Sequence, residues 1–212
     1  MTFEGELADI LPSDLPRRDA VIAGCATHLA MIVEANRLFN LTRIVSPREA
    51  AIKHVWDSIA PWRLFSQAKH VLDAGTGAGF PGIPLALVLP DTRFTLCESI
   101  GKKSRFVATV VESLALPNVS ALARRAEEVL REQKGIDLIT ARAVAPLSRA
   151  VQLFGPAIST GARVLLYKGP DAAAEIAEAA EEAKRRQVKM RVLARHELPD
   201  SLGSRTIVEM SR

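Results

Sequence analysis

Cysteine and histidine are both scarce in this chain of 212 residues. The two cysteines, Cys25 and Cys97, have no C-x-x-C spacing, and the four histidines are scattered at positions 28, 54, 70 and 196. Disulfide-stapled domains and protein metal sites need such residues in sets with defined spacing. The sequence therefore predicts two buried, reduced thiols and no bound metal.

Long hydrophobic runs are absent as well. The apolar stretch 83–89 is much shorter than the roughly 18 residues of a membrane-spanning helix. The N-terminus carries Glu4 and Glu6 where a secretory signal would carry basic residues. Hydrophobic residues make up 48% of the chain and charged residues 25%, which are ordinary values for a globular protein. We expect a cytoplasmic protein with no membrane segment.

The formal charge of +4 is not evenly distributed. Residues 1–68 hold 7 Lys/Arg against 8 Asp/Glu, whereas residues 69–212 hold 21 against 16. A basic excess confined to one part of a chain is typical of proteins that bind a polyanion. A solvated surface that is merely basic would give the same counts, so charge alone leaves both interpretations open.

Residues 1–66 are predicted to form a helical extension. Apolar residues recur near helical spacing between residues 19 and 39: Val21, Cys25, Leu29, Ile32 and Phe39. A second helix is predicted to begin at Ser46 as N-cap, with Pro47 in its first turn and Glu49 completing a capping box. Its inner face would comprise Ile52, Val55 and Ile59, and Pro61 would end it.

Residues 67–212 alternate between short apolar runs and helix-like stretches. The runs are 70–72, 94–97, 119–122, 136–140, 164–167, 192–193 and 206–210, and the helix-like stretches include 102–116 and 171–186. Strands that alternate with helices predict a mostly parallel sheet covered by helices on both faces. Only the loop 199–204 separates the last two runs, which predicts an antiparallel hairpin at one edge.

The most specific local pattern is the sequence VLDAGTGAGFPG at 71–82. It follows a predicted strand and opens a helix, the context in which a glycine-rich loop binds a ligand. Gly75 and Gly77 allow a tight turn and let backbone N–H groups approach a ligand closely. Open α/β sheets bind their ligands at this end of the strands.

Two acidic residues help to identify the ligand. A dinucleotide-binding loop would have Gly or Ala at position 80, where this chain has Phe80. Asp73 would face the phosphates of a dinucleotide, but it suits the cationic S-adenosylmethionine. Glu98 ends the second strand, where a carboxylate accepts ribose hydroxyls in either class of protein. The combination favours S-adenosylmethionine.

Two later segments suit the same pocket. Ala126 and Glu127 follow the third predicted strand, where a small residue would lie under an adenine ring. An ordinary helix start, with acids favourably placed in its first turn, explains them equally well. Arg142 follows the fourth strand at the same edge of the sheet, although a lone arginine is often only a surface charge.

Together these motifs resemble the GidB/RsmG methyltransferases, over the chain from about Asn36 to its end. The motifs are Asn40-Leu41-Thr42, His54-x-x-Asp57-Ser58, the loop 73–84 with its two prolines, Glu98-Ser99-x-x-Lys102-Lys103, Arg125-Ala126-Glu127, Arg142-Ala143 and Lys168-Gly169. The C-terminal Arg212 and the pair Thr140-Ala141 depart from the commoner family residues.

The resemblance implies a class I S-adenosylmethionine-dependent methyltransferase fold, Rossmann-like, with a seven-stranded sheet and an antiparallel edge hairpin. It also implies methylation of N7 of one guanine in 16S ribosomal RNA, on free RNA or on the small ribosomal subunit or its precursor. The protein would act as a monomer, and it would position the guanine without a general base. The implied cofactor contacts are Gly75, Phe80, Ala126, Glu127 and Arg142, supported by Asp73, Gly77 and Glu98.

The expected RNA surface starts at Lys102, Lys103 and Arg105, in the first turn of a predicted helix. The helix dipole disfavours cations there, so a compensating contact with phosphates is expected. Long side chains that simply reach into water are the alternative. Arg124, Arg125 and Lys168 would extend the surface.

Three rival functions remain open on the sequence. An NAD(P)-dependent oxidoreductase conflicts with Phe80 and Asp73. A small-molecule methyltransferase, or one acting on another RNA, would share the cofactor loop, and a small-molecule enzyme would not need the cations at 102–105. A non-catalytic RNA-binding module would not need the complete loop.

Overall fold

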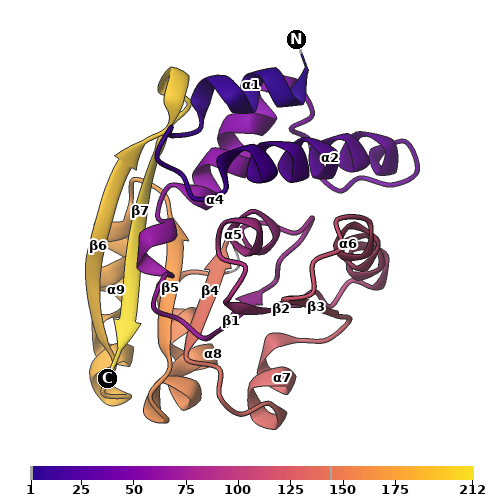
Figure 1. The fold of residues 1–212 in the computed structure, drawn as a ribbon. Helices are drawn as coiled ribbons and strands as arrows, with labels where there is room; N and C mark the ends of the chain where they lie inside the picture. The colour runs from indigo at the N-terminus through magenta and orange to yellow at the C-terminus, as the bar shows by residue number, and fades with distance from the viewer. Residues whose placement is uncertain (1, 144) are drawn as a thin grey trace.

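The computed structural model of the protein describes residues 2–143 and 145–212 and has one seven-stranded sheet at its centre (Figure 1). The strand order is β3-β2-β1-β4-β5-β7-β6, with β7 antiparallel to both of its neighbours and the other neighbouring pairs parallel. The strands are β1 His70–Ala74, β2 Arg93–Cys97, β3 Val119–Leu122, β4 Leu138–Arg142, β5 Arg163–Lys168, β6 Lys189–Glu197 and β7 Ser204–Ser211. The predicted fold class is confirmed.

Helices cover both faces of the sheet, as predicted (Figure 1). The helices that follow the strands are α5 Gly82–Val88, α6 Gly101–Ser113, α7 Ala126–Glu132, α8 Leu147–Ser159 and α9 Ala172–Arg185. Two apolar cores result, one that includes residues of α5 and α6 and one that includes residues of α7, α8 and α9. This arrangement places the loops after β1, β2, β3 and β4 at one edge of the sheet, because parallel strands end together.

The N-terminal residues form helices that pack on the α5 side (Figure 1). They are α1 Phe3–Ile10, α2 Arg18–Asn36, α3 Pro47–Ala50, a π-helical turn η1 Ala51–Trp56, α4 Asp57–Ile59 and a 3-10 turn η2 Trp62–Leu64. Leu29 of α2 and Phe65 belong to the same apolar core as Val71 of β1 and Ile83 of α5. Packing of this kind fixes the extension against the sheet.

The predicted capping box at the start of α3 is wrong. Pro47 does begin the helix, but the Ser46 side chain caps no backbone N–H, and the Glu49 carboxylate binds Lys53 Nζ at 2.8 Å instead. A lysine one turn later offers the carboxylate a charged partner, which is a stronger hydrogen-bond donor than a backbone amide. The predicted inner face, Ile52, Val55 and Ile59, is buried.

The two cysteines are free and buried, as predicted. Burial raises the pKa of the Cys25 thiol far above its usual range and that of Cys97 to about 12, so both remain protonated at neutral pH. Within residues 2–143 and 145–212, no helix is long and apolar enough to cross a membrane.

Candidate functional site

The loop between β1 and α5 has the backbone that its glycines predict. Gly75, Gly77 and Gly79 all have positive φ, at 70°, 62° and 100°. Residues that carry a side chain rarely adopt this backbone conformation, so glycine is favoured at each of these positions. A Cβ atom on Gly77 would meet no other atom within 4 Å, which means that this residue borders open space. The loop is therefore preformed and accessible at Gly77.

Asp73 closes the base of this loop. Its Oδ2 atom accepts hydrogen bonds from Thr76 Oγ1 at 2.6 Å and from the backbone N–H of Gly82 at 2.9 Å. The side chain is fully buried, and burial raises the pKa of Asp73 to about 6. Within the described residues the second oxygen, Oδ1, has no hydrogen-bond partner. Asp73 thus braces both ends of the loop and retains one unused acceptor.

Glu98 joins the end of β2 to the glycine loop. Its Oε2 atom accepts a hydrogen bond from Gly77 N at 3.1 Å, and Oε1 accepts one from Ile100 N at 2.8 Å. The carboxylate is buried at 7% exposure. A carboxylate has about four lone-pair sites, so these two bonds leave capacity for further donors. Glu98 is therefore placed to bind a ligand that lies along Gly77.

Ala126 and Glu127 begin α7 at the end of β3, next to β2 in the sheet. Ala126 is buried, and Glu127 is half-buried in the first turn, where the helix dipole favours an acid. The two residues thus form an ordinary helix start, and this start lies at the same edge of the sheet as Glu98. The expected contact with a cofactor stays a prediction for both residues.

Phe80 lies between the loop and the helical extension rather than in an open pocket. Its ring stacks on His28 at 4.6 Å and on His54 at 4.7 Å between ring centroids, and the residue is 4% exposed. His28 Nε2 lies 2.7 Å from the backbone oxygen of Ala78, so it must donate to this carbonyl. A cofactor contact of Phe80 would therefore come from its backbone.

Burial makes both of these histidines neutral. Desolvation is the main cause that lowers the pKa of His28 and of His54 to about 4. The scattered positions of the histidines in the sequence gave no sign of this stack, because it joins α2, η1 and the glycine loop. Only the position of His54 beside Asp57 and Ser58 on one predicted helix face hinted at a structural role.

Arg142 points toward the extension. Its Nη1 atom donates to the Lys53 carbonyl at 2.9 Å and to Asp57 Oδ2 at 3.0 Å, and its guanidinium carbon lies 5.4 Å from the centroid of the Phe80 ring. Asp57 is fully buried and also binds Arg205 of β7, through bonds of 2.7 and 2.8 Å. The predicted cofactor residue Arg142 is thus already engaged in an ion-pair cluster, in which sequence reasoning missed Arg205.

The predicted basic surface divides into unpaired and paired cations. Lys102 and Arg105 are exposed, Lys103 is half-buried, and Arg125 is exposed at the start of α7; among the described residues none of the four forms an ion pair. Arg124 instead makes two bonds of 2.6 Å to Glu132.

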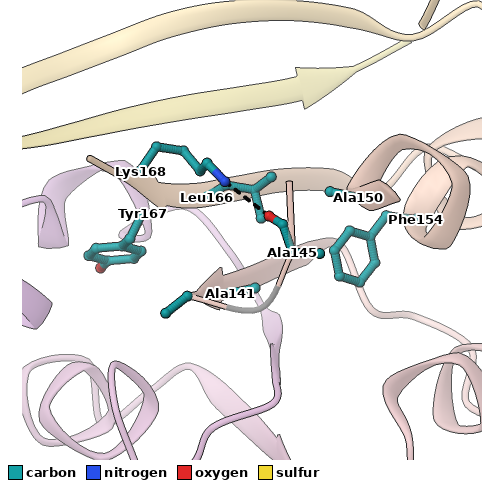
Figure 2. Close-up of a pocket in the computed structure, with 8 residues that line it drawn as sticks. Ala141, Ala145, Ala150, Phe154, Leu166, Tyr167 and Lys168 are labelled. Atoms are coloured by element: carbon teal, nitrogen blue, oxygen red, sulfur yellow. Dashed lines mark hydrogen bonds between the residues drawn. The ribbon is translucent and has the colours of Figure 1, made fainter. Parts of the chain in front are cut away.

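Lys168 is also bound within the protein. Its Nζ atom lies 2.6 Å from Glu175 and donates to the Ala145 carbonyl at 2.9 Å, across a small pocket at the ends of β4 and β5 (Figure 2). That pocket has room for about one water molecule. Arg124 and Lys168 are thus neutralised by carboxylate partners in this structure, and their contact with phosphates stays a prediction.

The described part of the chain contains no group of three or more His, Cys, Asp or Glu side chains arranged to hold a metal ion. What the glycine loop offers instead is a set of backbone N–H groups with the acceptors Glu98 and Asp73 beside it. Such a site suits an organic ligand with hydroxyl and ammonium donors.

Comparison with known proteins identifies close relatives. The sequence model of the family "GidB: rRNA small subunit methyltransferase G" matches residues 22–201. Ribosomal RNA small subunit methyltransferase G of Solibacter usitatus is 66% identical over 210 residues, which cover 99% of this chain and 100% of the relative. The protein of the same name from Lactobacillus johnsonii is 35% identical, covering 88% of this chain and 81% of its own.

Solved structures share the fold at low sequence identity. The precorrin-6y C5,15-methyltransferase of Geobacter metallireducens has a TM-score of 0.58 at 13% identity, covering 84% of this chain and 95% of its own. The O-methyltransferase TomG of Streptomyces achromogenes, solved in complex with S-adenosylmethionine, has a TM-score of 0.58 at 17% identity, covering 87% and 88%. These two similarities concern the fold alone.

Proposed function

The chain belongs to the GidB family of rRNA small subunit methyltransferase G proteins, and we propose that it methylates N7 of one guanine in 16S ribosomal RNA. The methyl donor is S-adenosylmethionine. The observation that carries the proposal is the glycine loop, with Gly77 tied to Glu98 at the carboxyl ends of β1 and β2. This is the place where an open α/β sheet binds its ligand.

Residues at the sheet edge fit this cofactor. We propose that Gly75, Gly77, Ala126 and Glu127 line its binding site and that Glu98 accepts its ribose hydroxyls. The unused Oδ1 atom of Asp73 is a buried acceptor beside the same loop. S-adenosylmethionine supplies an activated methyl group when it is bound. We assign Phe80 and Arg142 to the wall between this site and the extension 1–66, which packs on the methyltransferase domain 67–212.

The chemistry of N7 suits a site without an acid–base pair. This nitrogen has an in-plane lone pair and carries no proton, so its methylation needs no general base. Holding the reacting atoms in line can itself lower the barrier by roughly 7–11 kcal/mol. The protein's task is therefore to position the guanine and exclude water, with Arg142 a positioning candidate.

The proposal extends to the partner and the place of action. We propose that the substrate is 16S ribosomal RNA, free or in the small ribosomal subunit or its precursor, and that the protein acts in the cytoplasm as a monomer. A small-molecule methyltransferase is the alternative. Lys102, Lys103 and Arg105 at the start of α6, which have no ion-pair partner among residues 2–143 and 145–212, favour RNA.

The direct test is to map N7-methylguanine in 16S ribosomal RNA from cells with and without the protein. We expect one methylated guanine to disappear in the cells that lack it and to return on complementation. An unchanged map, together with methyl transfer to a small molecule, would favour the alternative.

Glu98→Ala should weaken the binding of S-adenosylmethionine by about 1–3 kcal/mol, because the variant removes a charged acceptor and releases Gly77 N. Isothermal titration calorimetry measures this directly. Glu112→Ala is the matched control, since it removes an exposed acid from α6. If both variants bind the cofactor like wild type, Glu98 does not contact it.

Lys102→Ala combined with Lys103→Ala should lower the affinity for RNA and leave the affinity for S-adenosylmethionine unchanged. Each lost phosphate contact should reduce the slope of log affinity against log salt by about 0.7–0.9. The control Lys184→Ala with Lys189→Ala removes the same charge from exposed positions near the C-terminal strands. Equal losses in both double variants would indicate a general charge effect instead of a contact.

A further inference from the structure

The loop 37–46, between α2 and α3, forms one continuous surface with the start of α6. Lys102 Nζ lies 5.4 Å from the centroid of the Phe39 ring. Ile100, just before α6, donates its N–H to Glu98, which in turn holds Gly77. This surface, made of residues 37–46 and 99–105, therefore borders the proposed cofactor site.

Large apolar side chains are exposed on this surface. Leu38 is 85% exposed, Val45 42% and Ile100 47%, whereas Val192, on the edge strand β6, is 37% exposed. Single exposed apolar residues are common and need no explanation. Here Leu38 and Ile100 lie near the residues of the contact between Lys102 and the Phe39 ring, beside the glycine loop. Such a concentration of apolar side chains is unusual for a surface that meets only water.

The loop that carries Leu38 is braced from within the protein. Asn36 Oδ1 accepts hydrogen bonds from the N–H groups of Leu41 at 2.8 Å and Thr42 at 3.4 Å, and Asn36 Nδ2 donates to the Thr42 carbonyl at 2.9 Å. Thr42 Oγ1 in turn hydrogen-bonds His54 Nε2 at 3.2 Å. A loop held in this way loses less conformational entropy when a partner binds to its exposed residues.

The charge on the surface is of one sign. Arg43, Lys102 and Arg105 are exposed, Lys103 is half-buried, and none of the four has an ion-pair partner in the part of the chain that the structure describes. Unpaired cations next to apolar side chains fit a single-stranded nucleic acid, which offers phosphates and accessible base faces together. A duplex buries its base faces and offers the apolar side chains little to contact.

We propose that this surface docks an unstacked, single-stranded segment of RNA beside the glycine loop. Leu38 and Ile100 contact base faces, while Arg43, Lys102 and Arg105 contact phosphates. The proposal rests on the proposed function and deepens it, because a guanine inside a stack must be extruded before its ring can reach an enzyme site. An apolar side chain next to the vacated position offsets part of the lost stacking.

The test compares Leu38→Ser with the control Val192→Ser, which makes a similar change on β6. The probes are a labelled single-stranded RNA of about 12 nucleotides and a duplex of the same sequence, titrated at several salt concentrations. Leu38→Ser should bind the single strand about fivefold more weakly, with an unchanged salt slope and unchanged duplex binding. Val192→Ser should match wild type with both probes.

Wild-type affinity of Leu38→Ser for the single strand, or an equal loss for both probes, would overturn the proposal. Both side chains are exposed, so thermal unfolding midpoints should match wild type and exclude misfolding. The proposed function is tested separately by methylation of 16S ribosomal RNA by the wild-type protein. If that methylation is absent while Leu38→Ser still loses single-strand binding, the function is wrong and the docking surface stands.

Discussion

Asp57→Ala should lower the free energy of unfolding by about 3–5 kcal/mol, a large part of the stability of a typical domain. The fully buried Asp57 carboxylate accepts hydrogen bonds from both Arg142 and Arg205. Their side chains are only 14% and 21% exposed, so the variant would leave two guanidinium groups without their counter-ion in a mostly buried setting. Denaturation with urea, followed by circular dichroism, measures the loss.

Asp14→Ala is the matched control for this prediction. Asp14 pairs with Arg63 at 2.7 Å, but both side chains are more than 60% exposed. Exposed ion pairs contribute at most about 1 kcal/mol, so the control should unfold nearly like wild type. Similar small losses in the two variants would show that the buried cluster does not hold the extension to the sheet.

The fold followed from local patterns in the sequence. All seven strands contain one of the short apolar runs. The pattern is clearest in the central strands β1, β4 and β5, since a strand that is buried on both faces needs apolar residues whatever its neighbours are. The glycines at 75 and 77 were equally predictable, because only a loop with positive φ explains them at the end of a buried strand. The π-helical turn at 51–56 was not predictable, since an α-helix and a π-helix share nearly the same apolar pattern.

The partners of the polar site residues were much less predictable. Asp57 and Arg205 lie 148 positions apart, and His28 and Ala78 lie 50 apart. Such pairs depend on how the extension packs on the sheet, which no local pattern encodes. For this reason the sequence predicts a cofactor contact for Arg142 but gives no sign that its guanidinium binds Asp57. The ion pair of Lys168 with Glu175 was equally unforeseen.

Stability should also depend on pH through the stack of Phe80 with His28 and His54. Their pKa values fall from 6.5 to about 4 in the folded protein. As the pH drops below 6.5, the unfolded chain binds protons on both residues while the folded protein does not. The free energy of unfolding therefore falls toward acid pH, by about 1.4 kcal/mol per pH unit for each histidine.

Asp73 opposes this trend over part of the range. Burial raises the pKa of Asp73 from 3.8 to about 6, so below pH 6 the folded protein binds a proton that the unfolded chain does not. This group stabilises the fold as the pH falls and offsets one of the two histidines between pH 6 and pH 4. We expect the three groups together to give a nearly constant net loss of about 1.4 kcal/mol per pH unit between pH 6 and pH 5, in urea denaturation at closely spaced pH values.

Two variants separate the opposing contributions. His28→Gln keeps a donor for the Ala78 carbonyl but cannot titrate, so its loss of stability between pH 6.5 and pH 4 should be shallower than that of wild type by about 1.4 kcal/mol per pH unit. Asp73→Asn removes the opposing group and should be steeper than wild type by a similar amount below pH 6. Parallel pH profiles for all three proteins would mean that neither residue titrates differently in the folded and unfolded chains.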